Sequence, residues 1–559
     1  MIGECPHILR ERSVLEFHLH DDMMSRIYRF RWHAFLWFPL LSIFTGFSQI
    51  QVNDDLRRTF SFEDPKFSSL IVASVDNRKI TAQEFLFNYE FGPAFTRREK
   101  DSRRRYLNFM IYEKLLALEG YARHLDTTEG ARQTLAEIEG DLATEELYKD
   151  DVRGKVKITE EEIDCGIRKA QINLTVKWLY ARSAEEARRL YEKFIGGIAF
   201  DSLFETQLGD SVKAEDRSIE TTRFKLEMAN PVLAHVLDTL CDGTISAPIN
   251  APDGYYIVKV VDSRKSLLMT ESENSHLHFD VERALVQQKS DSLSDLYLQK
   301  IMTGEHPTII RKPFDLLQTY LAKKILSPQE FSDWKLAERL LERWGQFDFM
   351  NIAPYEKQKL IELSRHTYTV KDYLVWYRAR EYNIRLDISS PQAFFISFEQ
   401  TVWRMVRDKL LTERAINRGL QKRNNVKKQM QWWMDKVVYK LVRGGIVDSI
   451  QLNDSLLNKY YAEYQRSYRN GKGDMIPFER AKEDVLRDFY SDELTKRLLH
   501  RILMLKEKYK VNMHDEELMT LPIDDDFNPR AIDVYAVKKG GTFPRPAFPS
   551  IDSEWQTWN

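Results

Sequence analysis

The sequence predicts a multidomain, mainly α-helical protein with two tandem copies of one helical module, the first of which holds an inserted α+β domain. Three observations predict this fold class: the chain length, an internal repeat, and a change of hydrophobic rhythm inside one copy. At 559 residues the chain is too long for one ordinary core, because domains usually hold about 100 to 200 residues. A hydrophobic content of 43% and an aromatic content of 12% favour folded domains over disorder.

The charge balance argues against a dominant nucleic-acid footprint. Lys and Arg total 83 and Asp and Glu total 85, whereas nucleic-acid-binding domains usually carry a clear basic excess. A local basic face stays possible. We expect no nucleic-acid partner.

The N-terminal region has the layout of a secretory signal. Arginines at positions 26, 29 and 31 precede an apolar run from Ala34 to Phe47, followed by small and polar residues. The run is shorter than the roughly 20 residues that span a bilayer, so a signal is favoured over a retained membrane helix. This predicts export to the periplasm or cell envelope, with membrane contact only through an uncleaved signal segment.

Residues 1–22, before the arginines, are mixed in charge and unlike the start of a signal. We therefore expect translation to begin at Met23 or Met24 and cleavage to fall near Ser48 or Gln49. Residues 1–48 form the predicted leader.

The cysteines and histidines predict no structural metal and no cofactor. Cys165 and Cys241 remain after the predicted cleavage, and two cysteines do not make the disulfide framework that small secreted domains need. Two independent thiols are favoured over a pair. His276 and His278 lack further ligand candidates nearby, and no zinc-type spacing occurs.

The internal repeat begins with two similar helix starts. The segments "ITAQEFLFNYE" and "YTVKDYLVWYR" each place a threonine, Thr81 or Thr369, before a helix with apolar residues at helical spacing. Glu84 and Asp372 follow three residues later, as in a capping box. Both threonines are therefore predicted helix N-caps.

The similarity continues downstream. The segment from Met110 to Leu125 aligns without a gap with that from Met405 to Leu420, and Thr159 and Asn453 are each placed to cap a later helix. A last correspondence pairs the helices that start at residues 279 and 478. Two copies of one helical module are the simplest account.

The copies differ in what precedes their last helix, and this difference sets the predicted boundaries. Copy two has only a polar, Gly-rich turn there, whereas copy one holds about a hundred residues of different rhythm. The predicted divisions are 65–169 plus 266–304 for the first module, 170–265 for the inserted domain, 305–364 for linker helices, 365–515 for the second module and 516–559 for an extended tail.

The inserted segment has the pattern of a small α+β domain. "INLTVKWLYA" alternates as a strand, two amphipathic helices follow around Gly196, and a third helix starts near Pro231. A turn into a strand and the closing strand "GYYIVKVVD" complete a predicted order of β-α-α-α-β-β.

These residues resemble the parvulin-type (PpiC-like) peptidyl-prolyl isomerases. The resemblance rests on "ARSAEEARRLYEKFIGGIAFDSL", on "LDTLCDGTISAPINAPDGYYIVKV", and on Phe224 followed by Met228. The flanking helices and the signal look like those of SurA- and PrsA-type exported folding chaperones, and copy two looks like the same chaperone module without a parvulin insert.

The resemblance implies a site for prolyl isomerisation, which is slow unaided because the amide has partial double-bond character. Such a site favours the twisted amide over both planar forms. In the family it uses two strand histidines and a Cys or Asp, and these positions are Trp178, Tyr256 and Asp210 here. Only the acid is retained, and Asp210 is equally well explained as a loop aspartate. The two rings either fill the space of the histidines or form an aromatic platform for extended peptides.

The resemblance also implies an apolar slot for the proline ring. Phe224 contributes to it, Met228 stands at the family's Met position if one residue is deleted, and Leu233, or Val232 in another register, stands at the Phe position. Each of these residues is also an ordinary choice for a packed helix.

The leading functional hypothesis is an exported folding factor that binds unfolded or outer-membrane-bound polypeptides through a domain whose isomerase activity is weak or lost. One alternative is an active isomerase in which Asp210 and the Tyr256 hydroxyl replace the usual polar groups. Another is a structural envelope protein with one fixed partner.

Overall fold

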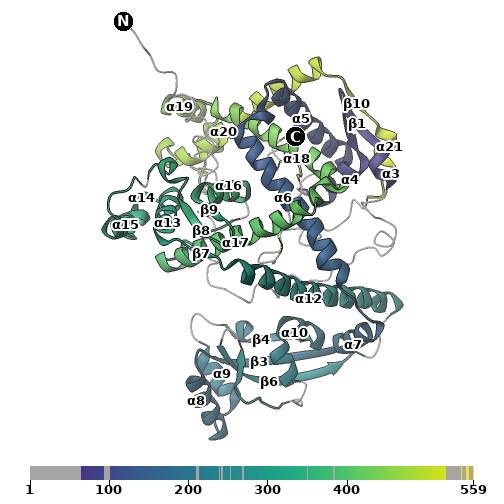
Figure 1. Ribbon diagram of the computed structural model, residues 1–559, viewed down its shortest axis with the longest axis vertical. Coiled ribbons are helices and arrows are strands. Elements are labelled where there is room, and N and C mark those ends of the chain that lie inside the picture. Colours follow the sequence, from purple (N-terminus) through teal and green to yellow (C-terminus); the bar gives the residue numbers. More distant parts are fainter. Residues whose placement is uncertain are drawn as a thin grey trace. The chain divides into compact units, whose positions relative to one another are not determined.

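The structure is a computed structural model of the chain, and Figure 1 shows its helices and strands. The described residues are 65–92, 101–208, 213–237, 240, 243–251, 254–266, 270–348, 350–381, 384–471, 473–523, 543, 549–552, 555 and 558. The predicted leader and signal lie outside them. No helix in this described part combines the length and apolarity that a membrane crossing requires.

The chain forms two compact units, residues 148–300 and the remainder. Both are built mostly from helices with small antiparallel sheets, which confirms the predicted mainly helical class. The unit 148–300 contains the predicted insert, 170–265, and adds the helix α7 (Glu160–Ala170) and most of α12 (Glu271–Glu305).

The unit 148–300 is built on a four-stranded antiparallel sheet with strand order β4-β3-β6-β5. Its central strands, β3 (Ile172–Ala181) and β6 (Gly254–Lys265), pair along most of their length. Helices α8 (Ala184–Ile195) and α9 (Phe200–Gln207) cover one face of the sheet, and α10 and α11 contribute to the core on the other face.

The predicted element order of this domain was wrong in two respects. A strand, β4 (Ser218–Thr222), follows α9, and two helices, α10 (Arg223–Ala229) and α11 (Pro231–Leu237), stand where one was predicted, so the order is β-α-α-β-α-α-β-β. β4 is a short edge strand with only one apolar residue, Ile219, in contact with the sheet core, and so it lacks a strong alternating pattern. The strand predicted after the turn in "CDGTISAPI" begins only at the last residue of that segment, as β5 (Ile249–Ala251), and an isolated bridge at Ile245 precedes it.

The remaining unit holds two small sheets, in each of which a hairpin pairs with a third strand separated from it in the sequence by several helices. The hairpin β1 (Ile71–Val75) and β2 (Arg78–Thr81) pairs with β10 (Val511–Met513). The hairpin β8 (Lys359–Glu362) and β9 (Thr367–Thr369) pairs with β7 (Thr308–Ile309). Because each antiparallel pair exchanges backbone hydrogen bonds, the two ends of this unit are joined by main-chain contacts.

Long helices from distant parts of the sequence also pack on one another in this unit. Helix α5 (Ser102–Ala122) packs on α18 (Asn424–Asp448), and Gly120 permits the close approach, since a Cβ there would lie 2.3 Å from Cγ1 of Val438. The core around α5 also receives α20 (Phe478–Lys508). Its other helices are α3 (Pro65–Ser69), α4 (Ala82–Phe91), α6 (Glu129–Asp151), α13 (Arg311–Ile325), α14 (Pro328–Asp333), α15 (Leu336–Trp344), α16 (Val370–Arg380), α17 (Pro391–Asn417), α19 (Asp454–Glu463) and α21 (Asp515–Met519).

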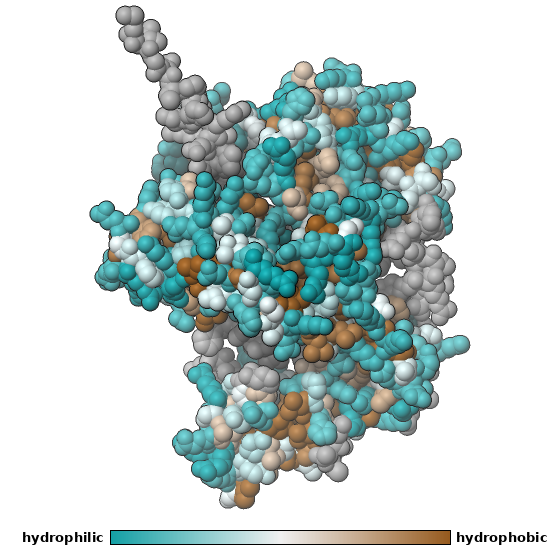
Figure 2. All heavy atoms as spheres, in the orientation of Figure 1, coloured by the Kyte–Doolittle hydropathy of each residue, from teal (hydrophilic) through white to brown (hydrophobic). Residues whose placement is uncertain are grey.

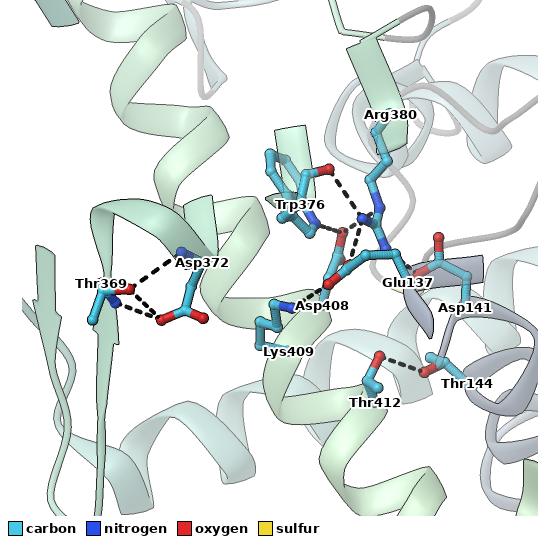
Figure 3. A network of polar contacts seen from close by, with 10 residues as sticks. All are labelled: Glu137, Asp141, Thr144, Thr369, Asp372, Trp376, Arg380, Asp408, Lys409 and Thr412. Atoms are coloured by element: carbon cyan, nitrogen blue, oxygen red, sulfur yellow. Dashed lines mark hydrogen bonds and ion pairs between the residues drawn. The ribbon is translucent and has the colours of Figure 1, made fainter. Parts of the chain in front are cut away.

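The predicted helix caps are confirmed. The hydroxyls of Thr81 and Thr159 accept hydrogen bonds from the backbone N–H groups three residues later, and the side chain of Asn453 does the same. Thr369 forms a complete capping box with Asp372, as Figure 3 shows. Each cap satisfies N–H groups that the first helical turn leaves without a partner.

A buried ionic network ties α6 to α16 and α17 (Figure 3). The Arg380 guanidinium bonds Glu137 at 2.8 Å and also bonds Asp141, while Asp408 accepts a 3.0 Å hydrogen bond from Trp376 Nε1. Burial raises the pKa of Asp141 to about 6, against the opposing attraction of Arg380. Such a network strongly penalises loss of one member, because an unpaired charge would remain buried.

Candidate peptide-binding site

Two tyrosines lie opposite each other on the central strands of the unit 148–300. Tyr180 on β3 is in register with Tyr256 on β6, and their rings meet edge to face with centroids 5.5 Å apart. Trp178, two residues earlier on β3, is on the same face because side chains alternate along a strand. All three rings are half-buried, so each combines a packed side with an accessible one.

A cation adjoins the tyrosine pair. The guanidinium carbon of Arg217 lies 5.0 Å from the centroid of the Tyr180 ring, within the range of a cation–π contact. Burial lowers the pKa of Arg217, and Tyr256 and Tyr180 act in the opposite direction. An arginine remains charged across the physiological range, so the site presents a fixed positive charge beside two aromatic rings.

The position of Tyr180 is fixed by two neighbours. The side-chain amide of Gln207, at the end of α9, accepts from Tyr180 N at 3.1 Å and donates to Tyr180 O at 2.9 Å. Gly254 has φ +147°, and a Cβ there would lie 2.6 Å from Cε2 of the Tyr180 ring. A glycine is therefore needed both for the backbone conformation and for the ring beside it.

The structure brings three of the sequence-predicted residues together. Trp178, Tyr256 and Leu233 all pack on one hydrophobic cluster between the sheet and α11. Val232, the alternative to Leu233, is exposed at 47%. The register that selects Leu233 is thus the one that places an apolar side chain against the cluster on which the two rings also pack.

Phe224 and Met228 lie elsewhere. They are four residues apart on α10 and so share one face of that helix, which packs on Ile163 of α7 and Val281 of α12. Leu226, on the opposite side of α10, is the residue that reaches the sheet cluster. Phe224 and Met228 therefore help to hold the domain against its two flanking helices.

Asp210 lies outside the described residues. The structure adds two residues that sequence reasoning missed, Tyr180 and Arg217. The two-residue period from Trp178 in "VKWLY" could have identified Tyr180 as a member of the same face. Nothing in the sequence around Arg217 signals that it reaches the rings.

The chemistry of this face suits binding more than proton transfer. Neither β3 nor β6 carries a histidine, the side chain whose unperturbed pKa lies nearest neutrality. Half-buried aromatic rings with an adjacent guanidinium instead offer large contact area at low entropic cost. Figure 2 shows hydrophobic residues gathered on part of the visible face of the unit that holds β3 and β6.

Comparison with known proteins finds similarity to proteins named PrsA, described as foldases or peptidylprolyl isomerases. The chain is similar to the foldase protein PrsA of Exiguobacterium sibiricum, with 25% identity over 166 residues. This match covers 29% of the chain, which spans about half (53%) of the length of that relative. No protein-family model matches the chain.

Solved structures of the same class are also similar. The peptidylprolyl isomerase PrsA of Bacillus cereus is 19% identical over 39% of this chain and 87% of its own, with a TM-score of 0.21. The foldase protein PrsA of Streptococcus pneumoniae is 16% identical over 41% of this chain and 92% of its own, with a TM-score of 0.20.

Proposed function

We propose that this chain is an exported folding factor of the cell envelope that binds unfolded polypeptides, and that its parvulin-like domain has weak or lost isomerase activity. The observation that carries the proposal is the Tyr180–Tyr256 pair with Arg217 beside it. Tyr256 stands where the resemblance implies a histidine. Similarity to the foldase PrsA supports the class of function.

The aromatic face gives this proposal a concrete binding mode. An extended client segment would lie across Trp178, Tyr180 and Tyr256, with apolar side chains against the rings and a backbone carbonyl within reach of the Arg217 guanidinium. Aromatic contacts of this kind are sequence-tolerant. Outer-membrane-bound polypeptides are one class of such clients.

We further propose that the helical part consists of two copies of one module with exchanged ends. The order β1-β2-α4-α5-α6-α7, closed by α12 and β7, parallels β8-β9-α16-α17-α18-α19, closed by α20 and β10. β10 pairs with β1 and β7 with β8, so each closing strand completes the hairpin of the other copy. Such exchange would keep the copies together and allow both to contact one client, with the gain that linked weak sites provide.

A second candidate is an active isomerase, and Arg217 is the observation that favours it. A guanidinium can donate to the carbonyl oxygen of an Xaa-Pro amide, and the Tyr256 hydroxyl and Asp210 would supply the remaining polar groups. Catalysis would then require stronger bonds to the twisted amide than to either planar form.

A protease-coupled assay with an Xaa-Pro peptide, run beside suppression of aggregation of an unfolded client, separates the candidates. The folding-factor proposal predicts suppression with little or no acceleration of isomerisation. Turnover that falls on Arg217→Lys and Asp210→Ala, with client binding unchanged, would favour the active isomerase. Co-purification with one stoichiometric partner and no suppression would favour a structural envelope protein.

A further inference from the structure

The end of the chain is held in a site of unusual chemistry in the helical unit. Trp555 is only 1% exposed. Its indole lies against the rings of Phe109 and Tyr112 on α5 and Tyr439 on α18, with centroids 5.7, 6.0 and 6.3 Å away. We call the set Phe109, Tyr112, Glu113, Lys436 and Tyr439 the aromatic cradle.

Glu113 makes the cradle specific for polar features of the segment it holds. Its Oε1 accepts from Trp555 Nε1 at 2.9 Å and from the backbone N of Asp552 at 2.7 Å. The Lys436 ammonium donates to both oxygens of the same carboxylate at 2.8 Å. One buried carboxylate thus binds an indole N–H and a backbone N–H three residues apart.

Cations around the cradle favour an acidic residue at the position of Asp552, three residues before Trp555. The Asp552 carboxylate accepts from the Tyr439 hydroxyl at 3.3 Å and lies 3.8 Å from Arg443 Nε. Burial would raise the pKa of Asp552, but Lys436, Arg443 and Lys440 together lower it. Three cations therefore face two carboxylates, and one of these two belongs to the bound segment.

The contacts depend on side chains spaced by three residues. Beyond Asp552 and Trp555, the Trp558 ring packs on Trp555 at 4.8 Å, and its carbonyl oxygen accepts from Arg105. Most of the contacts of this segment come from side chains, and it pairs with no described strand. The backbone turns at these positions, since the N–H groups of Trp555 and Trp558 each donate to the carbonyl oxygen three residues before. A peptide that adopts the same turns could make the same contacts from a different chain.

We propose that the aromatic cradle is a second polypeptide-binding site, which takes client segments with an acidic residue three positions before a tryptophan. The C-terminal segment of this chain occupies the site in cis and competes with such clients. The inference rests on the proposed client-binding function, although the cradle can be tested without it. A tethered occupant acts at a high effective concentration, on the order of millimolar for flexible linkers, so it sets the affinity that a client needs.

The test uses the full chain with a protease site inserted between residues 531 and 540, cut only after folding. A fluorescent peptide of residues 549–559 is then added, and its anisotropy is followed. We expect the cut fragment to exchange, the peptide to bind with a micromolar Kd, and the Trp555→Ala peptide to bind at least about thirtyfold more weakly, as expected for loss of a buried tryptophan. A Glu113→Gln chain should bind the wild-type peptide about tenfold more weakly, because a charge-assisted acceptor is lost.

A second competition experiment tests whether the acidic residue and the tryptophan are sufficient for a client to bind. A Gly/Ser-rich peptide that carries only Asp-Gly-Ser-Trp should displace the label, and a peptide with the same composition in scrambled order should not. Retention of the cut fragment without exchange, unfolding on its loss, or equal competition by the scrambled peptide would overturn the proposal. If the peptides bind as expected but aggregation is not suppressed, the folding-factor function fails while the cradle stands.

Discussion

The rings of Tyr180 and Tyr256 lie edge to face across the two central strands of the unit 148–300, at 5.5 Å between centroids and 65° between planes. They share their sheet face with Trp178 and adjoin Arg217. Trp178 and Tyr256 stand at the positions where the family resemblance implies histidines. We therefore propose that this face offers contact area and a fixed charge in place of side chains that titrate near neutral pH.

Removal of either ring should weaken peptide binding. We expect Tyr180→Ala and Tyr256→Ala each to raise the Kd for an unfolded client peptide about fivefold, since an aromatic contact contributes about 1 kcal/mol. Fluorescence anisotropy measures this directly. Tyr255→Ala is the matched control, because Tyr255 is the next residue on β6 and points to the opposite face. Equal losses in all three variants would contradict the aromatic platform.

Substitution of Gly254 should destabilise the unit that carries the platform. Gly254→Ala places a Cβ 2.6 Å from the Tyr180 ring and 2.8 Å from Ala181 O, at φ +147°, so we expect a loss of about 2–4 kcal/mol in chemical denaturation. Gly243→Ala is the control for the backbone term alone, since Gly243 also has a positive φ (+80°) but no atom within 4 Å of the added Cβ. It should cost about 1 kcal/mol. If the two variants lost the same free energy of unfolding, the close approach to Tyr180 would not contribute to stability.

The sequence alone predicted those features that depend on neighbouring residues only. The caps at Thr81, Thr159, Thr369 and Asn453 follow from short polar side chains before apolar helical runs, and all four form. Edge strand β4 was missed because its residues are polar and its pairing with β3 is set by tertiary contacts.

The candidate site was only partly predictable because tertiary contacts, which the sequence does not show, also determine which side chains meet there. A motif alignment placed Met228 and Phe224 in the proline slot, whereas the phase of α10 turns both toward α7 and α12. A shift of two residues along one helix turns a side chain to the opposite face. Arg217 reaches the rings from a segment distant in sequence, which no local pattern reports.

The buried Asp141 should make the stability of the helical unit depend on pH. Its pKa is raised by burial from 3.8 to about 6, so between these values the folded state binds a proton that the unfolded state releases. The free energy of unfolding should therefore fall as the pH rises from about 4 to about 6, by at most about 3 kcal/mol. Asp141→Asn should remove this component from urea denaturation curves.

Asp454→Asn is the control for the pH experiment, since Asp454 is an exposed partner of Lys482 on the same unit. This variant should keep the wild-type pH dependence between pH 4 and 6. A wild-type slope retained by Asp141→Asn would show that Asp141 titrates normally in the folded chain.

Lys114 should be essential for the stability of the α5–α18 core. Its ammonium lies 2.8 Å from both Glu84 on α4 and Asp435 on α18. These two carboxylates raise the pKa of Lys114 although burial alone would lower it. Lys114→Met should cost about 3–5 kcal/mol, because Glu84 loses its buried cation and Asp435 keeps only the more distant Arg78, 3.6 Å away.

Denaturant unfolding measures the loss, and addition of Glu84→Gln to Lys114→Met should restore part of it by removing one uncompensated charge. Lys482→Met is the control, as its exposed pair with Asp454 is screened by solvent and should contribute little to stability. If Lys114→Met and Lys482→Met were equally stable, the buried triad would have no structural role.

We propose that this chain binds unfolded polypeptides through an aromatic face with little remaining prolyl isomerase activity. One experiment on the full chain, with Tyr256→Ala in parallel, measures both acceleration of Xaa-Pro isomerisation and suppression of aggregation of an unfolded client. We expect suppression that weakens in Tyr256→Ala, with little or no acceleration in either chain. Isomerisation at the rate of an active parvulin, or aggregation unaffected by the wild-type chain, would contradict it.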